Sequence, residues 1–240
     1  LILQNMTQFF NVGAHNNILL QGADWNDGLD MAREHGESVA FSCMYAQNLE
    51  TLYKLIKKSA VDKIRILKEA TVFLNDSHKT DYSNAEEKQA LLKRYYKSVE
   101  TPVSGEKVDL DKNVLLNDLK CKSDWLKTHI KNQEWLKEGF FNGYYDNKSR
   151  RVEGKINGLM RMTLTGQVFP VMSGIAGHNQ IKILYANAKK YLQDKKLGGF
   201  RLNTDFKQEQ HDLGRAFSFA YGDKENGAFF NHMAVMFSFA

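Results

Sequence analysis

The stretch from Gln21 to Asp30, QGADWNDGLD, places three carboxylates and a tryptophan within ten residues. Glycines flank this cluster, and they would let a backbone and a ligand approach closely. Asp and Asn side chains often satisfy backbone amides in a turn that precedes a helix. Such a turn explains Asp24 and Asn26. It gives no reason for Trp25, because a large aromatic ring gains little in solvent.

Two kinds of ligand would use such a loop. A calcium loop of the EF-hand type needs a central glycine and a distal glutamate. Here Gly28 comes too early and the distal position holds no glutamate, which argues against calcium. A sugar accounts for all the parts, because tryptophan covers the apolar face of its ring while carboxylates and amides bind its hydroxyls. Glycosidic cleavage also needs a general acid, and an aspartate beside an aromatic surface can have its pKa raised toward that role. The residues alone do not choose among Asp24, Asp27 and Asp30.

A second cluster of polar residues lies within YGDKENGAFFNHMAVMF, residues 221–237. Its apolar end predicts a helix with Glu225 and Asn226 at or near the start, where backbone amides favour anions. His232 follows Glu225 by seven residues, about two helical turns, and would share its face. The cluster could therefore hold an anion. The alternative is a surface pair of Lys224 and Glu225 with a buried, hydrogen-bonded histidine.

Two further stretches contain residues of interest without a decisive pattern. RMTLTGQVFPVMSGIAG, residues 161–177, is rich in small side chains, which favours close helix packing over chemistry. His211 and Arg215 are polar candidates in HDLGRAFSFAYG. We leave His211, Arg215 and residues 161–177 outside the predicted site.

Composition excludes several classes of protein. The 240 residues, 42% hydrophobic and 25% charged, suffice for one large domain or two small ones. The net charge of +5 is modest, and the basic runs are typical of solvated helix faces, so we predict no nucleic-acid partner. Cys43 and Cys121 fit neither a disulfide framework nor a zinc site. With no membrane-spanning run and no signal-peptide pattern, we predict a cytoplasmic protein that does not bind membranes.

The elements that must position these residues are predicted to be helices. Apolar residues recur at helical intervals over 37–58, 60–75, 83–99, 112–135 and 179–194. Ser83 and Glu86 have the spacing of a capping box, and Asn179 can cap the last of these helices. Residues 100–111 and 139–166 are predicted to be long loops or short hairpins. We therefore expect an all-α fold of paired helices, with loops at one end building the site.

Three motifs together resemble a known family. GADWNDGLD with GESVAF, GKINGLMRMTLTGQVFPVMSGIA, and YGDKENGAFFNHMAVMFSFA match in order and approximate separation the inverting β-glycoside phosphorylases grouped around glycoside hydrolase family 94. The group includes cellobiose, chitobiose and laminaribiose phosphorylases. The long-chain β-glucan phosphorylases are the members that this sequence resembles most. The resemblance runs from about Gly13 to Ala240.

The resemblance implies a role for each site residue. The second Asp of the Asp-Trp-Asn-Asp motif is the general acid, which makes Asp27 the catalytic residue. Trp25 matches the tryptophan that lines the sugar site. Lys224 and Glu225 match sugar-contacting residues, and His232 matches the histidine that contacts phosphate.

The reaction that the resemblance implies is inverting phosphorolysis. Phosphate attacks the anomeric carbon directly while Asp27 protonates the departing oxygen, so that a β-linked gluco-oligosaccharide or β-glucan gives α-glucose 1-phosphate and a shortened glucan. No metal or organic cofactor is expected, because inorganic phosphate is the co-substrate. The full-length enzyme is expected to be a homodimer, and β-1,3 is the linkage we favour over β-1,2. The alternatives are an inverting β-glycoside hydrolase, with Glu225 as its base, and a non-catalytic carbohydrate-binding helical module.

The resemblance also implies an architecture. Residues 1–240 would form part of a catalytic (α/α)6 barrel with long loops and short β-hairpins at its active-site end. A β-rich N-terminal domain and a small C-terminal domain of the family would be absent from this chain. An upstream arginine and a downstream Thr-Gly pair, which hold phosphate in relatives, cannot be assigned here.

Overall fold

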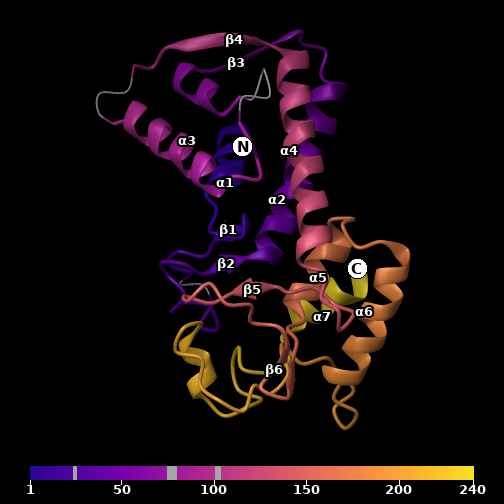
Figure 1. The fold of residues 1–240 in the computed structure, drawn as a ribbon. Helices are drawn as coiled ribbons and strands as arrows, with labels where there is room; N and C mark the ends of the chain where they lie inside the picture. The colour runs from indigo at the N-terminus through magenta and orange to yellow at the C-terminus, as the bar shows by residue number, and fades with distance from the viewer. Residues whose placement is uncertain (24–25, 75–79, 101–103) are drawn as a thin grey trace. The chain divides into compact units, whose positions relative to one another are not determined.

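The computed structural model describes residues 1–23, 26–74, 80–100 and 104–240. The chain divides into two compact units. Unit 1 comprises Leu1–Ile18 and Tyr45–Lys127, and unit 2 comprises Leu19–Met44 and Thr128–Ala240. The helices α2 (Val39–Lys58) and α4 (Lys112–Gln133) contribute residues to both units (Figure 1).

The prediction of an all-α fold was wrong, because the described residues combine helices with short strands in three small sheets. The fold is therefore mixed α/β. The strand pairs β2–β5, β3–β4 and β6–β7 are antiparallel. In chain order the remaining elements are α1 (Ile2–Phe10), β1 (Ile18–Leu19), β2 (Glu37–Ser38), β3 (Lys63–Leu67), η1 (Lys68–Phe73), α3 (Ala85–Ser98), β4 (Lys107–Asp111), β5 (Tyr144–Tyr145), β6 (Gly154–Ile156), β7 (Leu159–Arg161), α5 (Thr165–Met172), α6 (His178–Tyr191), η2 (Arg215–Ser218) and α7 (Asn231–Phe239).

The largest error of the helix prediction falls on residues 60–75. The sequence predicts a helix there, but the structure has strand β3 followed by the 3-10 helix η1. The physical reason is the alternation of charged and apolar residues in Lys63-Ile64-Arg65-Ile66, which has the period of a strand. Its pairing with β4 places Arg65 opposite Asp109, so opposite charges meet across the ladder.

The other predicted helices are confirmed with small shifts at their ends. Residues 37–58, 83–99, 112–135 and 179–194 correspond to α2, α3, α4 and α6. Helix α3 is capped by Asn84, not by Ser83: its Oδ1 accepts from the amides of Glu86 and Glu87 at 3.0 and 3.2 Å. Helix α6 begins one residue before Asn179 and has Gly177 at its N-cap.

The core of unit 1 is aromatic. Phe9 lies edge-on to Phe10, with ring centroids 5.2 Å apart, and to Trp125, with centroids 6.0 Å apart. The side chains of Lys88 and Lys122 are fully buried within this cluster. In the part of unit 1 that both helices share, α2 and α4 lie side by side (Figure 1), and Ser123 of α4 donates to the carbonyl of Ala46 at 2.8 Å.

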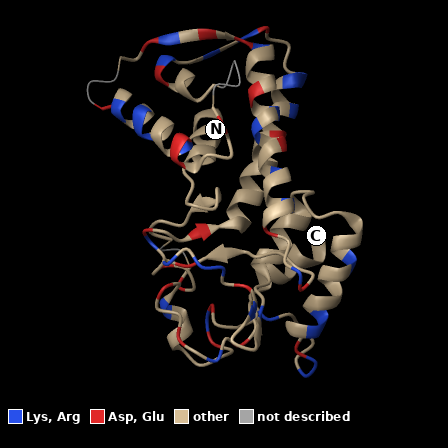
Figure 2. Cartoon of the chain, in the orientation of Figure 1, with Lys and Arg blue, Asp and Glu red and all other residues tan. Residues whose placement is uncertain are grey.

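Charged residues of unit 1 lie mainly on its outside. Figure 2 shows both signs of charge along the β3–β4 ribbon, and Asp or Glu at one end of α3 with Lys or Arg along the rest of it. Within the described ranges, no helix has the length and apolar character needed to cross a bilayer.

Unit 2 is built around the loops that join β5, β6, β7 and α5. Glu153, buried before β6, accepts from the amide of Gly143, from the amide and hydroxyl of Thr163 at 2.6 and 3.0 Å, and from Gln167 Nε2 at 3.1 Å. This network ties the β5 hairpin to the start of α5. Gly143 and Gly166 make the approach possible, because a Cβ on Gly143 would lie 2.7 Å from the Cα of Gly166. The packing role predicted for residues 161–177 is confirmed here.

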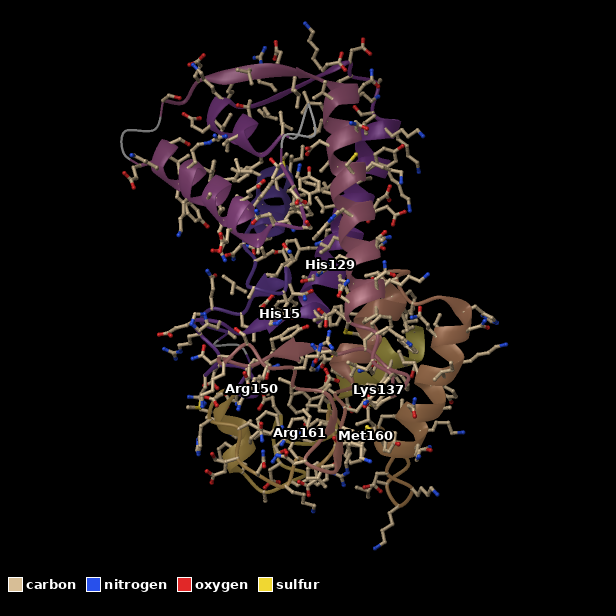
Figure 3. The ribbon with its side chains drawn as sticks, in the orientation of Figure 1. His15, His129, Lys137, Arg150, Met160 and Arg161 are labelled. Carbon is tan, nitrogen blue, oxygen red and sulfur yellow. The ribbon has the colours of Figure 1, made fainter. Side chains whose placement is uncertain are left out.

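Two arginines of the segment between β5 and α5, Arg150 and Arg161, are labelled in Figure 3. Arg150 pairs with Asp146 at 2.8 Å and with Asp212 at 2.9 Å. Arg161 is 4% exposed, and its guanidinium carbon lies 5.0 Å from the ring centroid of Phe206. Through Asp212 and Phe206, residues 205–213 pack against the segment between β5 and α5.

Candidate active site

The described residues 26–30 of the first motif form a tight turn in unit 2. Asn26 Oδ1 accepts from the amide of Gly28 at 2.8 Å, and the amide of Leu29 donates to the Asn26 carbonyl at 2.9 Å. Asp30 is 6% exposed. The turn interpretation of Asn26 is therefore confirmed, while Asp24 and Trp25 lie outside the described residues.

A second segment, residues 213–216, which includes the start of η2, contacts this turn through backbone groups. The amide of Ala216 donates to the carbonyl of Asp27 at 2.8 Å, and the amide of Met31 donates to the carbonyl of Leu213 at 3.1 Å. Between these bonds Gly214 approaches so closely that a Cβ there would lie 2.1 Å from the carbonyl carbon of Gly28. The backbone that presents Asp27 is therefore fixed by a segment far along the chain.

Arg215, the first residue of η2, contacts both Asp27 and Asp30. Its Nη2 donates to Asp27 Oδ1 at 2.6 Å, and its Nε lies 3.2 Å from Asp30 Oδ2. Its backbone amide donates to Asp30 Oδ1 at 3.0 Å. The hydrogen bond from Arg215 lowers the pKa of Asp27 below its ordinary value, and the positive charge of Lys224 adds to this effect.

The second motif forms a turn that precedes α7. Asn226 is buried, with its Nδ2 donating to the carbonyl of Phe219 at 3.0 Å and its Oδ1 accepting from Asn203 at 3.3 Å. Lys224 has φ +47° and Gly227 has φ +84°, both in the left-handed region. Arg201 donates to the carbonyl of Gly227 at 2.9 Å. These bonds fix Lys224 and Glu225 on an irregular turn.

The two motifs meet at this turn. Lys224 Nζ lies 3.8 Å from Asp27 Oδ2. A Cβ built on Gly28 would lie 3.3 Å from the Cβ of Glu225, so the two backbones approach closely there. The structure thus brings together Asp27, Lys224 and Glu225, three of the five residues that the sequence selects.

His232 lies beside the same cavity as Glu225, but not on a helix that contains both residues. The prediction that Glu225 lies near the start of a helix shared with His232 was wrong, because α7 begins at Asn231. His232 is exposed in the first turn of α7, with its ring centroid 5.5 Å from that of Phe230. Glu225 and His232 nevertheless line one cavity.

That cavity encloses about 240 Å³ within unit 2. Its walls combine phenylalanine, tyrosine and methionine side chains with leucines and a few polar groups, the composition typical of a small-molecule site. Asp27 and Lys224 are not among its lining residues and lie at its edge, next to Asn26, Gly28 and Glu225. The lining consists of Asn26, Gly28, Leu29, Phe41, Tyr144, Thr163, Thr165, Phe169, Leu202, Asn203, Leu213, Phe217, Glu225, Phe230, His232, Met233 and Met236.

Arg215 is the site residue that the sequence did not select. It touches the predicted general acid from a position 188 residues away. Nothing in the local pattern of HDLGRAFSFAYG marks it, because its partner is set by tertiary structure alone. His211, the other residue left outside the site, pairs with Glu209 at 2.6 Å and is not among the residues that line the cavity.

An apolar cavity with a few polar groups in its lining is typical of a small-molecule site. Among the described residues, no group of three or more His, Cys, Asp and Glu side chains is arranged to hold a metal ion. The model of the catalytic domain of the Glycosyl hydrolase 94 superfamily matches residues 106–240, more than half of the sequence. The chain therefore belongs to the Glycosyl hydrolase 94 superfamily, whose catalytic domain acts on glycosides. A search of curated proteins gave no match.

The matched range includes one of the two motifs. Lys224, Glu225 and His232 lie inside residues 106–240, whereas Trp25 and Asp27 precede them. Family membership thus supports an enzyme acting on glycosides. The roles of the individual site residues, and the assignment of residues 1–240 to part of one catalytic domain with flanking domains elsewhere, stay predictions.

Proposed function

We propose that this protein catalyses inverting phosphorolysis of β-linked gluco-oligosaccharides or β-glucan. The observation that carries the proposal is the meeting of Asp27 and Lys224, 3.8 Å apart, at the edge of a cavity that Glu225 and His232 line. Membership of the Glycosyl hydrolase 94 superfamily supports the substrate class.

The cavity provides the two kinds of surface that a sugar needs. Apolar side chains such as Phe217 and Phe169 offer contact to the ring faces, while Asn26, Asn203 and Glu225 offer hydrogen-bond partners for hydroxyls. Trp25, which lies outside the described residues, is proposed to contact the sugar. Lys224 and Glu225 are proposed to bind sugar hydroxyls.

The reaction needs a proton at the departing oxygen and a nucleophile on the opposite face of the ring. Asp27 is proposed to donate that proton as the bond between the anomeric carbon and the glycosidic oxygen breaks. A phosphate oxygen forms the new bond to the same carbon with inversion. Because phosphate already carries negative charge, no second carboxylate is needed to activate it.

Phosphate is proposed to bind beside His232. This histidine lies in the first turn of α7, where unpaired backbone amides and the positive end of the helix dipole favour anions. Lys224 and Arg215 add positive charge at the Asp27 end of the site.

The test is the identity of the product. The protein is incubated with β-1,3- and β-1,2-linked gluco-oligosaccharides, with and without inorganic phosphate, and both glucose 1-phosphate and free glucose are measured. We expect glucose 1-phosphate to form only when phosphate is present. Release of glucose without phosphate would instead support an inverting hydrolase, and binding without turnover would support a carbohydrate-binding module.

A further inference from the structure

One buried carboxyl group connects two walls of the cavity. Glu153 is 2% exposed. On one side it accepts from the amide of Gly143, the residue before Tyr144, and on the other it bonds the amide and hydroxyl of Thr163 at 2.6 and 3.0 Å. Tyr144 and Thr163 both line the cavity, and Glu153 is not among its lining residues. Glu153 therefore lies behind the wall that a ligand would touch.

The hydroxyl of Thr163 has three hydrogen-bonding positions, one proton and two lone pairs. The amide of Gly166 donates to this oxygen at 3.1 Å and occupies one lone pair. The bond between Thr163 and Glu153 occupies a second position. One position is left, and because Thr163 lines the cavity, a ligand bound there can use it.

The proton on Glu153 decides what the remaining position offers. When Glu153 is ionised, the Thr163 hydroxyl donates to it, and the position left for a ligand is a lone pair. When Glu153 is protonated, its O–H donates to the Thr163 oxygen, and the threonine proton is left for a ligand. The bonds from the amides of Gly143 and Gly166 can persist in both forms.

We propose that Glu153 is a positioning residue whose proton sets whether Thr163 donates a hydrogen bond to a sugar in the cavity or accepts one from it. The inference rests on the proposed function for its ligand, a gluco-oligosaccharide. A sugar hydroxyl both donates and accepts, so it can bind Thr163 in either form. A substituent that only accepts can bind in one form alone. Ionisation of Glu153 would therefore make the cavity select an unsubstituted hydroxyl.

The charged groups around Glu153 come from several segments. Four charged side chains share with it the lining of a second cavity of about 390 Å³: Lys137, Glu138, Arg151 and Lys155. Lys137 and Lys155 are exposed, so solvent reaches this side of the segment. Two further charged residues of unit 2 bind other groups. Glu134 accepts from the hydroxyl of Tyr145 at 3.0 Å, and Arg161 donates to Gln210 at 3.2 Å.

Both forms of Glu153 are accessible close to neutral pH. Burial is the largest influence on this carboxyl and raises its pKa to about 8, against the hydrogen bonds from Thr163, Gly143 and Gln167. Tyr144, on the cavity side, does not compete for the proton, because burial also raises the pKa of its hydroxyl above the ordinary value. Glu153 should therefore lose its proton as the pH rises through about 8, and Thr163 should change from donor to acceptor.

The first test needs no ligand. NMR follows the carboxyl carbon of Glu153 in a pH titration that extends about two units to either side of its pKa. We expect a single ionisation with a midpoint near pH 8. A carboxyl group that stays in one form over the whole range would overturn the proposal, whatever the protein binds.

The second test compares the affinities of two kinds of ligand by calorimetry. One is a β-linked gluco-oligosaccharide, and the other is the same molecule with one hydroxyl of its terminal glucose replaced by fluorine, which accepts hydrogen bonds but donates none. Asp27→Asn is the protein used, so that no turnover occurs and residue 27 does not titrate. Each hydroxyl of the terminal glucose is replaced in turn.

We expect one fluorinated derivative to respond to pH. Below the pKa of Glu153 it should bind about as well as the parent, because Thr163 donates to the fluorine. Above that pKa it should bind about fivefold more weakly than the parent, the loss of one neutral hydrogen bond. Affinity ratios that are independent of pH for every derivative would overturn the proposal.

Two threonines of the same cavity supply matched variants. Thr163→Val keeps the shape of the side chain without its hydroxyl, so the affinity ratio should lose its pH dependence, while Thr163→Ser should keep it. Thr165 also lines the cavity but hydrogen-bonds to Tyr144, so Thr165→Val should keep the pH dependence as well. Persistence of the dependence in Thr163→Val, or its loss in Thr165→Val, would overturn the role given to Thr163.

Failure of the proposed function would be recognised separately. If the wild-type protein forms no glucose 1-phosphate, phosphorolysis is wrong, and the affinity ratios still decide the role of Glu153. If no gluco-oligosaccharide binds at either pH, a sugar is not the ligand of Thr163 and the proposal is overturned. A merely structural Glu153 would leave every ratio constant with pH.

Discussion

Lys88 in unit 1 and Asp27 in unit 2 both ionise away from their ordinary pKa, for opposite physical reasons. Lys88 is fully buried, and its Nζ lies 3.8 Å from the ring centroid of Trp125 and 4.3 Å from that of Phe9. Burial, with the nearby charge of Lys122, lowers its pKa to about 7. The pKa of Asp27 is shifted chiefly by a hydrogen bond from Arg215, which is largely exposed.

The pKa of Lys88 is set by the packed core, whereas the pKa of Asp27 is set by one exposed side chain. A pKa set by burial changes only if the core opens, because the surrounding rings cannot leave. A pKa set by an exposed partner is open to screening by water and salt. Unit 1 therefore uses charge in packing, whereas the charge that acts on Asp27 in unit 2 lies open to solvent.

The largest effect is expected from Asp27→Asn. The amide keeps the shape of the carboxylate but cannot donate the catalytic proton, so glucose 1-phosphate release should fall by about 100-fold or more. Stability should hardly change, because the partner Arg215 is exposed and water screens the pair. Initial rates and thermal unfolding measure the two quantities. Full turnover in this variant would remove Asp27 from the mechanism.

The next effect tests the core of unit 1 by comparing its two buried lysines. Lys122 pairs with Asp118 and donates to the carbonyl of Phe73 at 2.9 Å. Lys122→Met takes one member from a buried ion pair and should lower the free energy of unfolding by about 3–5 kcal/mol. Lys88 Nζ has no hydrogen-bond partner among the described residues. Lys88→Met should therefore raise stability near neutral pH, where the buried ammonium group carries its full cost.

Urea denaturation of both variants measures this contrast. Equal losses of stability would show that the two lysines are held alike, contrary to the structure. A large loss in Lys88→Met alone would mean that contact with the Trp125 and Phe9 rings outweighs the cost of burying an ammonium group.

The third effect is a pH dependence assigned to Lys88. Between about pH 7 and its ordinary pKa of 10.5, the unfolded chain holds a proton on Lys88 that the folded chain has lost. The free energy of unfolding therefore rises with pH over this window, by on the order of 5 kcal/mol, and the full cost of burial is present at lower pH. Lys88→Met should lack this rise. Denaturation across the window compares the two proteins, and identical slopes would contradict the buried state of Lys88.

The smallest effect is expected at the surface of unit 1. Arg65 and Asp109 are 69% and 47% exposed, so their ion pair is screened by water. Arg65→Gln should leave the free energy of unfolding almost unchanged, and added salt should remove what difference there is. Thermal unfolding at low and high salt measures this change. A large loss of stability at both salt concentrations would show that the β3–β4 ribbon depends on this pair.

The helices could be predicted because their signals are local. Apolar periodicity and end residues are present within each stretch, and α2, α3, α4 and α6 followed them to within a few residues. The strand β3 was missed because Ile64, Leu67 and Ala70 also fit a helical stripe, and its partner β4 lies about forty residues away. Strand pairing over such a distance leaves little mark on the local pattern.

The site could be predicted only in part for a similar reason. The resemblance selected Asp27, Lys224, Glu225 and His232, and the structure places these residues in or beside one cavity. The helix proposed to join Glu225 to His232 failed, because the turn ending at Gly227 has a left-handed backbone. Arg215 was missed because it meets Asp27 through the docking of two loops, which no spacing in the sequence encodes.

The central claim, direct attack by phosphate with Asp27 as acid, is tested most directly by the configuration of the first product. Proton NMR of a reaction between a β-linked gluco-oligosaccharide and inorganic phosphate distinguishes the anomers as they form. The account predicts α-glucose 1-phosphate as the initial product, at a rate that falls to zero without phosphate. Appearance of the β-anomer, or of free glucose in phosphate-free buffer, would contradict it.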